Sequence, residues 1–119
     1  MFNCLSARFE PRLFVISTIP FRNRHLYPWP SLQPRVFVHA HDIFLPFEYP
    51  LSWVRDKKWF WTEQHFLQAF LAFNSAFEVV LALRYMHAYH RQALAQAAPV
   101  LARYPFTKPG SLWMRRKME

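Results

Sequence analysis

Proline and glycine are both missing from residues 51–98, and this interval constrains the possible folds more than any other feature of the sequence. Seven of the ten prolines lie before it, where they interrupt helices and remove donors from sheets. The chain has a single glycine, Gly110, and glycine is the usual residue of tight turns. We therefore expect one long helix over residues 62–97, ended by Pro99, rather than a compact fold with many turns.

The expected chain is mainly α, has three parts and has no independent globular core. Residues 1–50 form an extended arm rich in proline and aromatic residues, residues 51–98 form the helical region, and residues 99–119 form a basic tail. Two stretches of the arm, residues 12–18 and 34–44, hold enough β-branched and aromatic residues for short strands or extended chain. A shorter helix can precede the long one within the helical region.

Residues 66–83, FLQAFLAFNSAFEVVLAL, are long and apolar enough to raise the question of a membrane span. As a helix they would extend roughly 27 Å, and roughly 17 to 25 residues are needed to cross a bilayer. Their ten Leu, Phe and Val residues favour insertion by about 3 to 6 kcal/mol, and an ionised Glu78 opposes it by about 2 to 3 kcal/mol. We therefore predict a single transmembrane span over about residues 65–84, secured by neighbouring helices that satisfy its polar groups.

The predicted helix has two unlike faces when its residues are placed at intervals of about 100°. One face carries aromatic rings at helical spacing, which we expect to contact lipid: Phe66, Phe70, Phe73 and Phe77. The opposite side is small and polar, which suits close packing and hydrogen bonding between helices: Gln68, Asn74, Ser75 and Glu78. A carboxylate at membrane depth is also a candidate for proton transfer, but we favour a structural role for Glu78.

Aromatic and basic side chains flank both ends of the predicted span, as in the interface belts of membrane helices. Before the span lie Trp53, Trp59 and Trp61 among three cations, and after it lie Arg84, Tyr85 and Arg91. Residues 84–110 hold four positive charges and no acid, whereas residues 41–61 balance at zero. By the positive-inside rule, we expect the carboxyl-terminal side in the mitochondrial matrix.

No familiar catalytic or cofactor motif is present, so we expect no enzymatic activity, no cofactor and no metal. His39 and His41 share one side of an extended strand beside Asp42, but a metal site would need further ligands from elsewhere. His87 and His90 are three residues apart on the predicted helix, and we expect them among lipid headgroups.

The first thirty residues are rich in Arg and Phe and contain Glu10 as their only acid, which is the bias of a mitochondrial targeting segment. Together with a weakly inserting span, this predicts a non-catalytic accessory subunit of a respiratory-chain complex in the mitochondrial inner membrane. We expect complex I first, because it contains the most small single-span subunits. The partners would be other subunits and membrane lipid, including anionic lipid such as cardiolipin, and no nucleic acid.

Three other functions fit parts of the sequence. The net charge of +8 and the basic end WMRRKME suit a mitochondrial ribosomal protein that binds rRNA and neighbouring proteins. An accessory subunit of ATP synthase would share the features of the favoured prediction. A soluble helical interaction protein would instead place the phenylalanine face in the groove of a partner.

Overall fold

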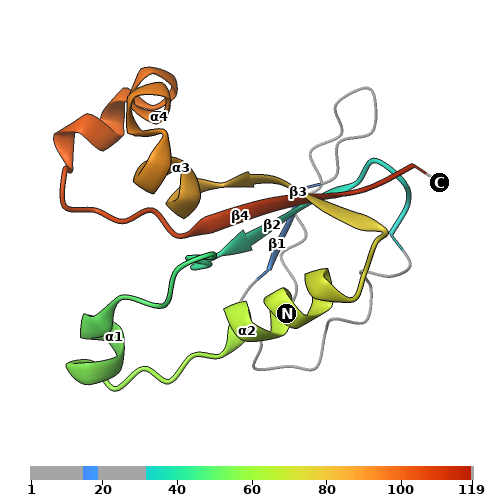
Figure 1. Ribbon diagram of the computed structural model, residues 1–119, viewed down its shortest axis with the longest axis horizontal. Helices are drawn as coiled ribbons and strands as arrows, with labels where there is room; N and C mark the ends of the chain where they lie inside the picture. Colours follow the sequence, from blue (N-terminus) through green and yellow to red (C-terminus); the bar gives the residue numbers. More distant parts are fainter. Residues whose placement is uncertain (1–14, 19–31, 119) are drawn as a thin grey trace.

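Residues 62–97, which we expected to form one helix, instead contain three helices and a strand. The computed structural model describes residues 15–18 and 32–118 (Figure 1). Its elements follow in the order β1 (Val15–Thr18), β2 (Phe37–His41), α1 (Leu51–Arg55), α2 (Glu63–Ala72), β3 (Phe77–Ala82), α3 (Leu83–Tyr89), α4 (Arg91–Ala97), the 3-10 helix η2 (Pro99–Arg103) and β4 (Ser111–Arg116). The chain is therefore an α/β domain, and the prediction of a mainly α chain without an independent core is wrong.

The predicted long helix stops at Ala72 because the next residues form a turn. Phe73 leaves helical geometry at φ −113° and ψ 11°, and the Asn74 Oδ1 accepts a hydrogen bond from the Ala76 N–H at 3.0 Å. Asparagine competes with a helix in this way because its short side chain bonds nearby backbone groups. β3 follows with the sequence FEVVLA, and its adjacent branched valines favour a strand.

No helix within residues 15–18 and 32–118 is long and apolar enough to cross a membrane. The longest of these helices, α2, has ten residues, whereas a bilayer requires roughly 17 to 25. The rest of the predicted span over residues 65–84 belongs to a turn, to β3 and to the start of α3. The prediction of a transmembrane helix in this segment is therefore wrong.

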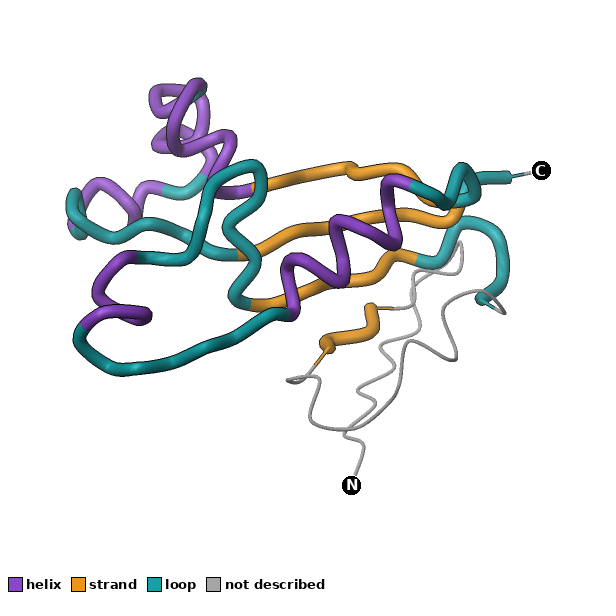
Figure 2. The backbone as a smooth tube through the Cα atoms, turned by 60° about the horizontal axis from the view of Figure 1, so that its bottom comes forward, coloured by secondary structure: helices purple, strands orange, loops and turns teal. Residues whose placement is uncertain are grey.

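Four strands form one sheet in the order β1-β2-β4-β3. β1 runs parallel to β2, whereas β4 lies antiparallel to both of its neighbours, β2 and β3. β1 and β2 fall within the two stretches of the amino-terminal arm that we expected as strands or extended chain. β4 comes from the segment that we expected to be a basic tail, yet it takes an inner position in the sheet (Figure 2).

The core lies between the sheet and α2, which crosses one face of the sheet (Figure 2). Alternate residues of β2 and β4 point to this face, as the pleat of a strand requires. The buried set from strands, helix and connecting loop is Val38, Ala40, Ile43, Leu67, Phe77, Leu112 and Met114. Strands that are distant in the sequence are therefore held together by one apolar layer under α2.

The chain makes tight turns almost without glycine. Arg35, Asp42 and Lys58 adopt positive φ angles of 68°, 57° and 57°, a region in which residues other than glycine are uncommon. The single glycine, Gly110, serves a close approach instead, because a Cβ atom there would lie 2.6 Å from the ring of Phe44. Our expectation that a shortage of glycine excludes a compact fold is therefore wrong.

Candidate nucleic-acid interface

The connection from β3 to β4 carries positive charge and no acidic residue. It contains α3, α4 and η2, and these helices gather at one end of the sheet (Figure 1). Residues 83–110 hold four Lys and Arg residues and neither Asp nor Glu. The positive field of this stretch is not compensated within it, and such a field attracts anionic partners.

Three of these cations act on His87, which lies on α3. The Arg84 guanidinium lies 3.3 Å from the His87 Nδ1. Burial lowers the pKa of His87, and the positive charges of Arg91, Arg84 and Lys108 lower it further. Arg84 therefore contacts the His87 ring directly, and the charges of Arg91 on α4 and of Lys108 in the loop before β4 also act on it.

The three cations have no carboxylate partner among the residues that the structure describes. Arg91 donates a hydrogen bond to the carbonyl oxygen of Pro105 at 3.2 Å, which leaves its charge uncompensated. Like charges held together without counter-ions repel one another, and an anion bound between them removes this repulsion. Guanidinium and ammonium groups are also the donors that bind phosphate oxygens in proteins.

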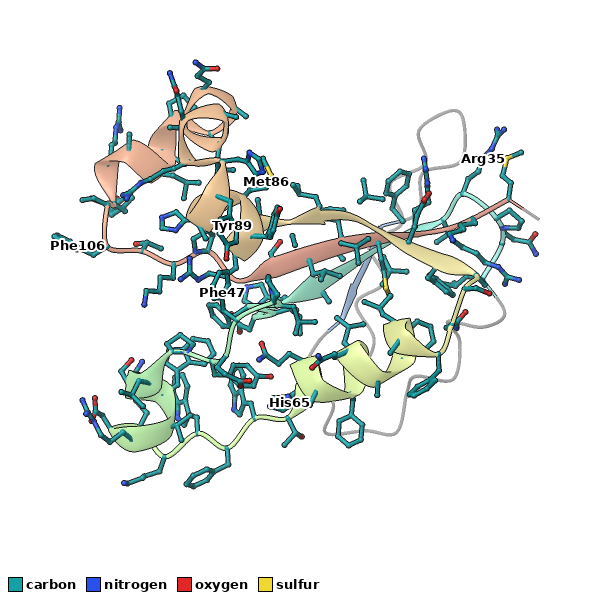
Figure 3. The ribbon with its side chains drawn as sticks, viewed as in Figure 1. Arg35, Phe47, His65, Met86, Tyr89 and Phe106 are labelled. Atoms are coloured by element: carbon teal, nitrogen blue, oxygen red, sulfur yellow. The ribbon has the colours of Figure 1, made fainter. Side chains whose placement is uncertain are left out.

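Aromatic rings line the same surface. Tyr89 stacks on Phe47 with centroids 6.0 Å apart and 26° between the planes. Figure 3 labels both residues, which come from different parts of the chain. Tyr85 lies 4.9 Å from Tyr89, and the guanidinium carbon of Arg84 lies 4.6 Å from the centroid of Phe47. Tyr89 is 62% exposed, and Phe106 in the loop before β4 is 95% exposed and points away from the fold (Figure 3).

These cations and rings form one surface with the composition of a site for single-stranded nucleic acid. Phosphates pair with Arg and Lys, while unstacked bases lie on aromatic side chains. A neutral imidazole can also donate a hydrogen bond to a phosphate oxygen. We call the set the His87 surface; it comprises Phe47, Arg84, Tyr85, His87, Tyr89, Arg91 and Lys108.

The residues that we expected in interface belts at the two ends of one helix lie in two groups that no single helix joins. Arg84, Tyr85 and Arg91 belong to the His87 surface. Trp53, Trp59 and Trp61 lie in α1 and the loop after it, and they contact one another there. No single helix separates the two groups, because α2 and β3 lie between them in the sequence.

The four phenylalanines that we expected on a lipid-facing ridge do not share one helix. Phe66 and Phe70 lie on α2, and Phe73 ends that helix with 92% exposure. Phe77 begins β3 and is 5% exposed, and its ring lies 5.2 Å from that of Phe70. One member of the predicted ridge is therefore in the core while another is in contact with solvent.

The polar residues that we expected to join neighbouring helices have other contacts. Glu78 accepts a hydrogen bond from the Nε of Arg115 at 2.8 Å, because the two residues face each other across β3 and β4. Asn74 shapes the turn after α2, Ser75 is exposed in that turn, and Gln68 is exposed on α2. Glu78 thus belongs to a cross-strand ion pair rather than to a spanning helix.

His39 and His41 on β2 lie edge-on to each other with ring centroids 6.4 Å apart, and each also has a contact of its own. His39 stacks on Trp113 with centroids 4.5 Å apart, and its Nε2 lies 3.1 Å from the Ser111 hydroxyl. The Nδ1 of His41 lies 2.8 Å from the carboxylate of Asp42. Within the described ranges, no group of three or more His, Cys, Asp or Glu side chains is placed to hold a metal ion.

We did not predict Phe47 or Lys108 as site residues, and we placed Tyr89 in a membrane belt. The stretch RYMHAYHR, residues 84–91, carries the available signal, because it mixes cations with rings and has no acid. We assigned that stretch to a membrane belt, and only the fold brings Phe47 and Lys108 beside it. Comparison of the chain with protein-family models, with curated proteins and with solved structures finds no match.

Proposed function

We propose that the chain is a non-catalytic RNA-binding module that holds single-stranded RNA on the His87 surface. The observation that carries this proposal is the contact of Arg84 with both the His87 ring and the Phe47 ring, in a stretch where Arg84, Arg91 and Lys108 have no carboxylate partner in the described residues. Binding of rRNA by a mitochondrial ribosomal protein, expected above as an alternative, is a role of this kind.

Single-stranded RNA fits the His87 surface better than a duplex does. A duplex hides the faces of its bases, and proteins commonly enter a groove with a long helix or a pair of strands. The helices α3 and α4 have only seven residues each. The exposed ring of Tyr89 can instead stack on a base that is already unpaired. Because every base has a flat face, binding of this kind depends little on base sequence.

Three phosphate contacts set the expected salt dependence. For a single strand, each neutralised phosphate lowers the logarithm of the binding constant by about 0.7 for a tenfold rise in salt. The three cations around His87 therefore predict a slope of about −2. Each stacked base adds about 1 to 3 kcal/mol, so stacking should account for most of the affinity that remains at high salt.

A mitochondrial location is part of this proposal, and it is supported by the Arg- and Phe-rich first thirty residues. Most of that segment, residues 1–14 and 19–31, lies outside the described residues. A role as an accessory subunit of complex I or of ATP synthase stays a prediction that the fold does not test.

Fluorescence anisotropy with a labelled oligo-uridine of about 12 nucleotides tests the proposal. Arg84→Ala and Arg91→Ala should each weaken binding about threefold to tenfold and make the salt slope shallower by about 0.7. Arg103→Ala is the matched control, because it removes one positive charge from the same connection but not from around His87. Its affinity should stay within about twofold of the wild-type value.

Equal losses for Arg103→Ala and Arg84→Ala would show that net charge, rather than the His87 surface, attracts the RNA. A folded wild-type chain that does not bind the oligonucleotide at low salt would overturn the proposal outright. A duplex of the same length should bind more weakly than the single strand, and the reverse order would contradict the role given to stacking.

A further inference from the structure

A second exposed surface lies around α1, at the same end of the sheet as α4 but on its other side in the view of Figure 1. We call residues 51–61 the tryptophan lobe. Trp53 lies 5.3 Å from Trp59 and 5.2 Å from Trp61, while Trp59 and Trp61 lie 5.4 Å apart with planes 7° from parallel. Trp53 also lies 5.3 Å from the buried ring of Phe44. The lobe is therefore an aromatic cluster attached to the core.

Hydrogen bonds fix the shape of the tryptophan lobe. The Trp59 N–H donates to the Trp53 carbonyl at 2.8 Å, which closes the loop after α1. At the base of the lobe, the Gln64 N–H donates to the Tyr49 hydroxyl at 3.0 Å. A surface that is ordered before it binds loses less conformational entropy on binding. The exposed groups of the lobe are thus presented in a fixed arrangement.

Apolar side chains of the lobe face outward. Phe60 is 72% exposed, Leu51 is 64% exposed, and Trp59 and Val54 are 40% and 39% exposed. Water in contact with such side chains is released when a partner surface covers them. Apolar groups gathered on one protruding segment indicate a place of interaction rather than scattered surface residues.

The charge of the lobe indicates the sign of its partner. Arg55, Lys57 and Lys58 are exposed, and the only acid among residues 51–62 is Asp56, which pairs with Arg55 at 3.2 Å. The lobe therefore carries a net charge of +2, from three cations and one acid. Cations beside exposed apolar rings complement a surface that is anionic outside and apolar beneath.

We propose that the tryptophan lobe docks on an anionic membrane surface. Leu51, Trp59 and Phe60 enter the layer between headgroups and acyl chains, and Lys57 and Lys58 contact lipid phosphates. Tryptophan favours this layer because its ring is apolar while its N–H can still be hydrated. Each basic residue near an anionic leaflet raises the affinity about fivefold. This inference does not rest on RNA binding, because it uses a different set of residues.

Lipid fits the lobe better than RNA does. The ring of Trp59 lies parallel to Trp61 and has the Lys57 ammonium 4.4 Å from its centroid, so it already makes its ring-face contacts within the lobe. Leu51 and Val54 offer no flat surface for a base, yet both gain from burial among acyl chains. The ring of Tyr89 on the His87 surface is more exposed, at 62%, than that of Trp59, at 40%.

Cosedimentation of the full chain with vesicles tests the proposal. Vesicles of phosphatidylcholine with about one third phosphatidylglycerol should bind the protein far better than vesicles of phosphatidylcholine alone. Leu51→Ser with Phe60→Ser should lower partition at least about tenfold, because two exposed apolar side chains no longer enter the layer. Phe73→Ser is the matched control, since Phe73 is 92% exposed at the far end of α2 and should bind like the wild type.

The outcomes separate this proposal from the proposed function. The double variant Arg84→Ala with Arg91→Ala should bind vesicles like the wild type. Loss of RNA binding in this variant would therefore not contradict the membrane proposal. Unchanged partition after Leu51→Ser with Phe60→Ser, or no preference for anionic vesicles, would overturn the anchor. Loss of oligo-uridine binding in that variant, with vesicle binding kept, would make the lobe a nucleic-acid surface instead. Phe60→Ser alone repeats the test with a single change at an exposed position.

Discussion

The ring of Phe44 occupies the space in which a side chain at Gly110 would begin. A Cβ atom on Gly110 would lie 2.6 Å from the Cζ, 2.7 Å from the Cε1 and 3.0 Å from the Cε2 of that ring. The Asp42 N–H donates to the Gly110 carbonyl at 2.8 Å, which holds the two segments together beside the ring. Phe44 in turn meets Trp53 edge-on at 5.3 Å. The start of β4, the core and the tryptophan lobe therefore meet at one side chain.

Gly110→Ala should lower the free energy of unfolding by about 1 to 3 kcal/mol, because the added methyl group overpacks a buried ring. Urea unfolding followed by circular dichroism measures this loss. In a Phe44→Leu background the same substitution should cost less, since the shorter side chain leaves room for the methyl group. A Gly110→Ala chain as stable as the wild type would contradict the close approach of the two residues.

The strands could be predicted only in part, and β3 and β4 show why. β2 lies in a stretch with enough β-branched residues to indicate extended chain, and local preference was sufficient there. β3 lies in a run that is apolar at nearly every position. Both a helix and a buried strand fit such a run, so the spacing of Phe77 from the phenylalanines before it did not distinguish them. β4 has three consecutive apolar residues, Leu112, Trp113 and Met114, so its sequence does not alternate between apolar and polar residues. The alternation appears only in the structure, where Leu112 and Met114 are buried.

Gln64 joins α2 to the loop that leads to the His87 surface, and its removal should be costly. Its Oε1 accepts from the Phe44 N–H at 3.1 Å, and its Nε2 donates to the Phe47 carbonyl at 3.2 Å. Gln64→Leu leaves both backbone groups without these partners in a site that is 1% exposed, so we expect a loss of about 2 to 4 kcal/mol. Gln68→Leu, one turn further along the same helix and exposed, should change stability by less than about 0.5 kcal/mol. Equal melting temperatures for the two variants would rule out this role of the amide.

Two phenylalanines four residues apart distinguish this fold from a long helix. Phe73→Arg should change the free energy of unfolding by less than about 0.5 kcal/mol, because Phe73 is 92% exposed. Phe77→Arg should cost more than about 4 kcal/mol and prevent folding, because Phe77 is 5% exposed and a buried charge there has no partner. Thermal unfolding of both purified variants provides the measurement. Similar damage from the two substitutions would mean that both rings face the same environment, as on a single helical ridge.

The positive charge of the His87 surface could be predicted from the sequence, but the full set of residues that form this surface could not. Residues 84–91 show cations and rings without an acid, which is a local property of the sequence. Phe47 and Lys108 join them only because the fold brings distant segments together. The sequence around either residue does not indicate this neighbourhood. The same mixture of rings and cations also suits a membrane interface, so local chemistry alone does not distinguish the two kinds of surface for Arg84.

Binding of RNA at the His87 surface should become tighter as the pH falls. In the free protein, burial and the charges of Arg91, Arg84 and Lys108 hold the pKa of His87 below 6.5. A phosphate bound among these cations adds negative charge beside the ring, which raises the pKa of His87 in the complex. Between the two pKa values the complex binds a proton that the free protein does not, so the dissociation constant decreases as pH falls through this window.

The effect of pH on folding stability has the opposite sign to its effect on RNA binding. An unfolded chain protonates His87 near pH 6.5, whereas the folded free protein does so only at lower pH, so stability declines as pH falls from 6.5 toward the lowered pKa. Anisotropy titrations with oligo-uridine between about pH 8 and pH 5.5 measure the binding effect, and the imidazole Cε1–H resonance reports the pKa directly. His87→Ala should remove most of the pH dependence, and His65→Ala, at an exposed position on α2, should keep it. Because both variants lose one imidazole, equal pH profiles for the two would place the titrating group outside the His87 surface.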